Sequence, residues 1–101
     1  KIMSKKLISS YEVFNKEVKW SGGTFISHKI KKDGKIFDLR ITKALTEKLG
    51  ECELLSQVGK FIVSCANDDI WLVEKDKDGT KLKYPFYRIK GIESFEKVVK
   101  E

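Results

Sequence analysis

Apolar and polar residues alternate over much of this chain, in short runs that are typical of β-strands. Residues 61–66, 70–75 and 81–87 are rich in β-branched and aromatic side chains, and turn residues separate the three runs. They predict three consecutive antiparallel strands, which form a meander.

The loop between the last two runs sets their expected register. If Lys75 faces Thr80, then Trp71 lies opposite Tyr84, and both belong to the apolar face that packs into the core. Pro85 has no N–H for a ladder hydrogen bond, so we expect the last strand to be an edge strand or to end near Tyr84.

An Asp33-Gly34 turn between alternating runs, 24–32 and 35–41, is the strongest short-range signal in the sequence. It predicts a β-hairpin, because this dipeptide suits the two-residue turn that joins twisted strands. The same pattern places His28 on the apolar face. The expected cross-strand pairs are Lys32 with Lys35, Ile30 with Phe37, Lys29 with Asp38, His28 with Leu39 and Ile26 with Ile41.

Three segments have a helical pattern. Thr42 is a suitable N-cap for a short helix over 43–49, with Gly50 at its C-terminal stop. Residues 4–18 are ambiguous, because they show apolar residues at helical spacing and also some alternation; a helix is the expectation. Residues 92–100 carry apolar residues at helical spacing after Gly91 and predict a terminal helix.

These elements predict a small α+β protein with a single domain over residues 1–101. It would contain an antiparallel β-hairpin, a three-stranded meander and short helices. Lys1-Ile2 precede Met3 and resemble residues added ahead of a native start.

The composition is 41% hydrophobic and 36% charged, which favours a folded chain with a dense ionic surface. No apolar run is long enough to span a bilayer, and no secretory signal precedes the strands, so a cytoplasmic protein is expected, in the host cytoplasm if the source is viral. Cys52 and Cys65 lack metal-ligand spacing. Cys65 is expected to be a buried free thiol, with a disulfide as the minority alternative.

Candidate catalytic and metal-binding patterns are weak. His28 is the only histidine, and a lone histidine on an apolar face is more often a core residue than a ligand. The acids at 74, 76 and 78 resemble half of a calcium loop, but position 85 is proline where a bidentate glutamate is needed. Ser21-Gly22-Gly23 lacks the remainder of a phosphate-binding loop. The sequence therefore predicts no enzyme, no cofactor and no metal site.

Net charge is the strongest functional signal. The chain has a formal net charge of +6, with nineteen lysines and two arginines, and lysines gather near both predicted hairpin tips. Such a surface attracts polyanions, and phosphate contacts supply most non-specific affinity for nucleic acid. A solvated face in a lysine-rich proteome is the alternative. The candidate nucleic-acid-binding residues are Lys29, Lys31, Lys32, Lys35, Arg40, Lys75, Lys77, Lys81 and Lys83.

Two resemblances to nucleic-acid-binding families are visible. The order of a helix at 43–49, three strands and a helix at 92–100 resembles the double-stranded-RNA-binding domain, although that family has a longer first helix. Residues 32–50, KDGKIFDLRITKALTEKLG, resemble the core of AbrB-type swapped-hairpin DNA-binding proteins, but lack the expected proline and the following Gly-Asp turn. Neither resemblance assigns a family.

The expected function is that of a small basic non-enzymatic protein that binds nucleic acid non-specifically through phosphates. A phage, an archaeal virus or another mobile element is the expected source, because many such elements have AT-rich genomes and an AT-rich genome encodes proteins rich in lysine. The alternative is a protein-interaction module, either a homodimer or an inhibitor of a host factor, with no nucleic-acid role and exposed aromatic residues such as Trp20, Phe86 and Tyr87.

Overall fold

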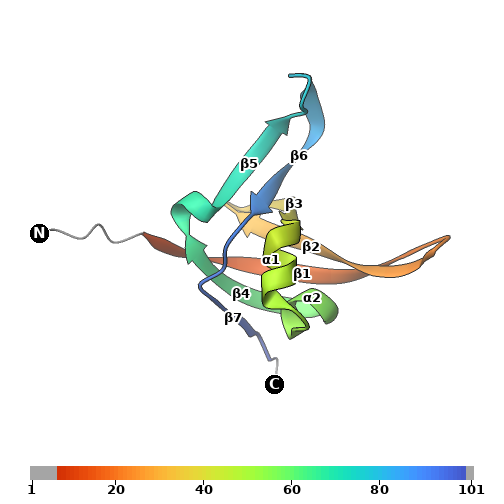
Figure 1. The fold of residues 1–101 in the computed structure, drawn as a ribbon, viewed down its shortest axis with the longest axis vertical. Coiled ribbons are helices and arrows are strands. Elements are labelled where there is room, and N and C mark those ends of the chain that lie inside the picture. The colour runs from red at the N-terminus through yellow and green to blue at the C-terminus, as the bar shows by residue number, and fades with distance from the viewer. Residues whose placement is uncertain (1–6, 100–101) are drawn as a thin grey trace, which may run out of the picture.

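The computed structural model describes residues 7–99, and most of them belong to a single seven-stranded sheet (Figure 1). Its strand order is β5-β6-β3-β2-β1-β4-β7. Neighbouring strands are antiparallel except β3 and β6, which are parallel. The strands are β1 Ile8–Trp20, β2 Gly23–Lys32, β3 Lys35–Ile41, β4 Gly59–Ala66, β5 Ile70–Lys75, β6 Lys81–Ile89 and β7 Ser94–Lys97.

Two short helices, α1 (Lys43–Leu49) and α2 (Glu53–Ser56), lie on one face of this sheet (Figure 1). Each contributes one buried leucine, Leu45 or Leu54, to the core beneath it. The molecule is therefore an α+β protein dominated by its sheet. The core cluster consists of Val13, Ile30, Leu39, Leu45, Leu54, Phe61, Val63, Cys65, Ile70, Tyr87 and Ile89.

The elements with strong local signals have the predicted form. β2 and β3 pair in the predicted register from Lys32 opposite Lys35 to His28 opposite Leu39, where the ladder ends, so the predicted pair of Ile26 with Ile41 does not form. Asp33 and Gly34 in the turn both have positive φ, 52° and 79°. The Thr42 hydroxyl caps α1 by accepting a hydrogen bond from the Leu45 N–H.

The helix expected over 4–18 is wrong: the described part of that segment belongs to β1, the longest strand. Tyr11, Val13 and Asn15 face the core, whereas Phe14 and Val18 lie on the opposite face. Because apolar residues occupy both faces, their spacing imitates a helical stripe. Residues 1–6, which include Lys1-Ile2, lie outside the described part of the chain.

The C-terminal helix expected over 92–100 is also wrong. The chain there forms β7, which pairs with the outer edge of β4 through residues such as Phe95 opposite Val63. Phe95 packs against the core, with its ring 6.4 Å from that of Phe61. The exposed edge of β4 supplied backbone partners that outweighed a weak helical pattern.

The three-stranded meander does not form. β4 lies between β1 and β7, and β5 and β6 lie at the other end of the sheet. The 3-10 turn η1 (Asn67–Asp69) separates β4 from β5. The element order therefore departs from that of a double-stranded-RNA-binding domain, since the strands are not consecutive neighbours and the last element is a strand.

The predicted register of β5 and β6 is wrong as well. Lys75 lies opposite Lys81 rather than Thr80, and an irregularity between Val73 and Lys75 shifts the pairing further, so Trp71 lies opposite Arg88 rather than Tyr84. Trp71 is 38% exposed and Tyr84 is 73% exposed, so neither lies in the core. A mutation to alanine at Trp71 should consequently cost less stability than a core substitution.

Pro85 lies within β6, an interior strand, contrary to the expectation of an edge strand or a strand end. It is tolerated because it falls outside the paired residues: β6 pairs with β3 only from Phe86 onward, and Pro85 lies beside the irregularity in the ladder with β5.

The first hairpin extends beyond the sheet. β1 pairs with β4 only as far as Asn15, and β2 pairs with β3 only as far as His28, so residues 16–27 form a projecting two-stranded ribbon, here called the arm (Figure 1). Ser21 and Gly22 form its turn, between Trp20 and Gly23, which pair with each other. Among residues 7–99 no helix is long and apolar enough to cross a membrane.

Candidate nucleic-acid interface

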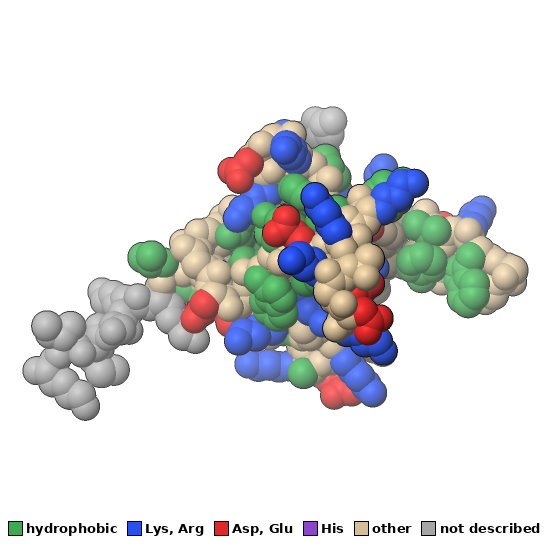
Figure 2. All heavy atoms as spheres, turned by 90° about the horizontal axis from the view of Figure 1, so that it is seen from above, with side chains coloured by type: hydrophobic (Ala, Val, Ile, Leu, Met, Phe, Trp, Pro, Cys, Tyr) green, Lys and Arg blue, Asp and Glu red, His purple; other side chains and the backbone are tan. Residues whose placement is uncertain are grey.

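The face of the sheet opposite the helices, here called the open face, is covered by no helix of the described chain. Alternate residues of each strand project from this face, and they include both cationic and aromatic side chains. Figure 2 shows how widely Lys and Arg side chains spread over the molecule, in contrast to the hydrophobic side chains on the arm. The open face includes Glu12, Phe14, Lys16, Val18, Phe25, Ser27, Lys29, Lys31, Ile36, Asp38, Arg40, Lys60, Trp71, Val73, Phe86 and Arg88.

The two arginines of the chain are neighbours on this face. Arg40 of β3 and Arg88 of β6 are Cα partners across the parallel ladder, and Trp71 of β5 is the next residue in the same row. Arg40 was a predicted site residue. Arg88 and Trp71 were missed, because only the pairing of β3 with β6, distant in sequence, brings the three together.

Both guanidinium groups are available to a ligand. Within residues 7–99 neither Arg40 nor Arg88 forms an ion pair with a carboxylate, and both residues are exposed. The Arg40 guanidinium carbon lies 3.9 Å from the centroid of the Phe86 ring. This cation–π contact fixes the group in place and leaves its N–H edges free to donate to phosphate.

Two other cations of the open face, Lys29 and Lys60, are neutralised by neighbouring carboxylates. Lys29 forms an ion pair with Asp38, its cross-strand partner, as the sequence register predicted. Lys60 forms an ion pair with Glu12 at 2.5 Å, and the hydrogen bond from Lys60 is the main cause that lowers the pKa of the Glu12 carboxyl. Lys29 is therefore a weaker candidate for phosphate binding than Arg40 or Arg88.

The lysines of the two hairpin tips lie at the same end of the sheet. β3 and β6 are parallel, and each begins just after a hairpin turn. Both turns therefore lie at the same end of the sheet, beside the N-terminal ends of these two strands. Lys31 of β2 and the β5–β6 tip lysines thus border the open face at this end. The tip lysines are Lys75 and Lys81, which face each other, Lys77 in the loop, and Lys83, whose Nζ lies 5.5 Å from the Tyr84 ring centroid.

Lys32 and Lys35 are placed differently. They share the side of the hairpin that faces the helices, and the Lys32 Nζ lies 5.6 Å from the Tyr11 ring and 5.4 Å from the Tyr87 ring. Lys32 therefore covers the end of the core, on the opposite side of the hairpin from Lys29 and Lys31. Strand alternation already indicates this separation.

An apolar groove crosses the middle of the open face. Phe14, Ile36 and the side chains of Lys16 and Lys29 line a cavity of about 290 Å³. A second cavity, of about 350 Å³, is lined by Lys29, Ile36 and Tyr84 among others, and connects this region with the β5–β6 tip. Aromatic and aliphatic surface thus lies between cationic groups.

His28 lies at a different site, on the helix-covered side of β2. Its Nδ1 is 2.6 Å from the Asn15 Oδ1, and the Asn15 amide nitrogen donates to the carbonyl oxygens of Leu54 and Gln57 at 2.6 and 2.9 Å. Those carbonyls can only accept, so the Asn15 oxygen must face His28, and the His28 Nδ1 must carry the proton. Burial lowers the His28 pKa below its ordinary value of 6.5.

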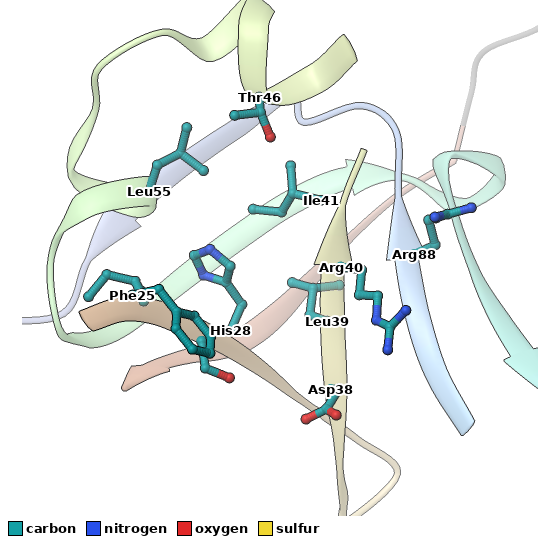
Figure 3. A pocket seen from close by; sticks show the side chains of 11 residues that line it. Phe25, His28, Asp38, Leu39, Arg40, Ile41, Thr46, Leu55 and Arg88 are labelled. Carbon is teal, nitrogen blue, oxygen red and sulfur yellow. The ribbon is translucent and has the colours of Figure 1, made fainter. Parts of the chain in front are cut away.

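A cavity of about 540 Å³ opens beside His28, where β2 and β3 diverge (Figure 3). Phe25 and His28 come from one strand, Arg40 and Ile41 from the other, and Thr46 and Leu55 lie above on the helices. His28 lies at the edge of the core, half-buried and hydrogen-bonded to Asn15, on the side of β2 that the sequence pattern predicted.

Neither cysteine forms a disulfide, and Cys65 is fully buried in the core as predicted. Burial raises the pKa of the Cys65 thiol to about 11, and the nearby Asp69 carboxylate acts in the same direction. Within residues 7–99 no three His, Cys, Asp or Glu residues are grouped to hold a metal ion. The Asp76 carboxylate instead accepts hydrogen bonds from the Asp78 and Thr80 N–H groups of its own loop.

Comparison of the chain with protein-family models, with curated proteins and with solved structures gave no significant match.

Proposed function

We propose that this protein binds single-stranded nucleic acid on its open face, with little sequence preference. The observation that carries the proposal is the adjacency of Arg40 and Arg88. No carboxylate of the described chain pairs with either guanidinium group, and both residues are exposed. Each arginine can therefore bind a phosphate group of the same strand, because arginine donates to phosphate in a planar, bidentate geometry.

The surroundings of the arginine pair favour a single strand over a duplex. Trp71 lies beside Arg88 and is 38% exposed, and Phe14 and Phe25 are partly exposed further along the face. Unpaired bases can stack on such rings, whereas the stacked bases of a duplex cannot reach them. Cations along the sheet and at the hairpin tips would then follow the backbone.

Sequence preference should be weak. Most cations of the chain are lysines, which act as point charges on phosphate and seldom read base edges. The two arginines lie on strands β3 and β6 of the sheet, and the ribbon that projects from it, the arm, carries no arginine to read base edges. Recognition would therefore rest on charge and stacking.

The test is the salt dependence of binding to a fluorescent oligothymidine, followed by anisotropy. Three phosphate contacts on a single strand give a slope of about −2 in log Kobs against log salt concentration. Arg40→Gln combined with Arg88→Gln should make the slope shallower by about 1.4, at about 0.7 per contact. Trp71→Ala should weaken binding by about 1 to 3 kcal/mol with the slope unchanged, because it removes stacking and no charge.

A matched control is Lys43→Gln combined with Lys48→Gln, which removes two charges from exposed positions of α1 on the other side of the sheet. This control should leave the slope nearly unchanged. Equal losses in both double variants would mean that net charge alone drives binding. No binding of the unaltered protein at low salt would refute the proposal and favour the protein-interaction alternative. Of the aromatic residues expected to be exposed for that alternative, Trp20 on the arm is exposed, whereas Phe86 and Tyr87 are buried, contrary to the expectation.

A further inference from the structure

The arm carries an unprotected strand edge. β2 pairs with β3 only from His28 onward, so the edge of residues 23–27 that would face β3 has no strand beside it within the described chain. The cavity beside His28 lies along this edge and separates Phe25 from Arg40 and Ile41 (Figure 3). An added strand therefore has room to approach.

Hairpin geometry identifies the backbone groups on this edge. The residues that flank a two-residue turn exchange hydrogen bonds, so Trp20 pairs in this way with Gly23, and Lys32 with Lys35. The backbone N–H and C=O groups of successive residues point to opposite sides of a strand. Those of Phe25 therefore point toward β1, and those of Thr24 and Ile26 point toward the free edge. Two N–H and two C=O groups thus point outward.

Other edges of the sheet are protected as natural sheets require. β7 has only four residues and carries Glu96 and Lys97, and β5 ends in Glu74 and Lys75. The segment 23–27, GTFIS, has no charge and no proline, and Phe25 is 50% exposed. A free edge of this composition is typical of a strand-pairing surface.

We propose that this edge pairs with the same edge of a second copy of the chain, antiparallel, about a two-fold axis at Phe25. In this register Thr24 of each copy faces Ile26 of the other, so all the outward backbone groups of both residues gain partners. Phe25 faces Phe25 of the second copy in a non-hydrogen-bonded pair, where side chains approach most closely. The pairing is self-complementary and opposes no like charges along the segment.

The dimer has a structural consequence for the open face. Cross-strand partners project to the same side of a sheet, and Phe25 belongs to the open face, so the two open faces lie on the same side of the joined ribbon. The short segment buries little area, so the affinity should be weak. Each copy carries a net charge of +6, so added salt should strengthen the dimer, opposite to its effect on nucleic-acid binding.

Sedimentation equilibrium of the whole chain tests the proposal, at concentrations from roughly 10 μM to roughly 1 mM, where weak interfaces associate. The weight-average mass should rise from 11.7 kDa toward twice that value, and should rise further with salt. Phe25→Lys places two lysines at the two-fold axis and should keep the protein monomeric. Thr24→Pro removes only an outward N–H and should also weaken the dimer.

Trp20→Lys is the matched control, because it removes an aromatic side chain and adds a charge on the arm but not on the β2 edge. It should dimerise like the unaltered chain, and circular dichroism melts should show that all variants are folded. A monomer at every concentration and salt would overturn the proposal. So would dimerisation of Phe25→Lys and Thr24→Pro to the normal extent, or loss of the dimer in Trp20→Lys alone.

Discussion

Asn15 is the buried polar side chain of the described core, and it ties α2 and the turn that follows it to the sheet. It is 2% exposed and uses its amide group fully: two hydrogen bonds to carbonyls and one from His28. This role could not be predicted from the sequence, because asparagine is depleted in strands and its presence suggests a break in the strand. Only the fold brings Leu54 and Gln57 to its side.

Asn15→Ala should lower the free energy of unfolding by about 2 to 4 kcal/mol, since it leaves buried carbonyls and the His28 N–H without partners. Urea denaturation measures the change. Asn67→Ala is the control, because the Asn67 side chain accepts a hydrogen bond from Ser9 at an exposed position. It should cost less than about 1 kcal/mol, and equal costs for the two variants would contradict the network described here.

His28 should make stability depend on pH. Burial lowers its pKa in the folded state, so below its ordinary value of 6.5 the unfolded chain binds more protons than the folded chain. Stability should therefore be complete above pH 6.5 and decline as the pH falls below it. Melting temperatures from pH 8 to pH 5.5 measure this decline.

His28→Gln, which retains a donor for Asn15 but does not titrate, should remove most of the decline in that window. Glu12 also titrates abnormally, but its lowered pKa acts only in more acidic solution, below its ordinary value of 4.5. The same decline in His28→Gln would show that another group is responsible.

At the scale of elements, local signals were sufficient for β2, β3 and α1. The Asp33-Gly34 turn and the Thr42 and Gly50 caps act within a few residues, so the sequence pattern located them correctly. β1 was missed because Phe14 and Val18 are apolar on the open face, which obscures the alternation. β7 was missed because its partner, β4, lies far away in the sequence.

Gly34→Val should lower the free energy of unfolding by about 1 to 3 kcal/mol, because Gly34 has a φ of 79°, where a β-branched residue is strained. The cost would come from the backbone alone, since a Cβ at Gly34 would meet no atom within 4 Å. Asp33→Asn is the control, because asparagine adopts positive φ readily and should leave the melting temperature nearly unchanged. An unaltered melting temperature in Gly34→Val would contradict the turn.

At the scale of the whole molecule, the candidate interface depends on pairings that no local pattern contains. Arg40 and Arg88 are 48 positions apart, by subtraction of their residue numbers, and become neighbours only because β3 and β6 run parallel. Of the predicted site, Arg40, Lys29 and Lys31 share the open face, the β5–β6 lysines border it, and Lys32 belongs to the other side. Trp71 lies on the open face rather than in the expected core, because its neighbours Ile70 and Leu72 occupy the core side of β5.

The central claim is that the open face binds single-stranded nucleic acid, and a nuclear magnetic resonance titration of the ¹⁵N-labelled protein with oligothymidine tests it most directly. The two indole N–H signals are internal probes, because Trp71 lies on the open face beside Arg88 and Trp20 lies near the tip of the arm. We expect shifts at the Trp71 indole and at the amides of β3, β5 and β6, with the amides of α1 and α2 unmoved. Shifts confined to the helices, or a spectrum unchanged at low salt, would contradict the account.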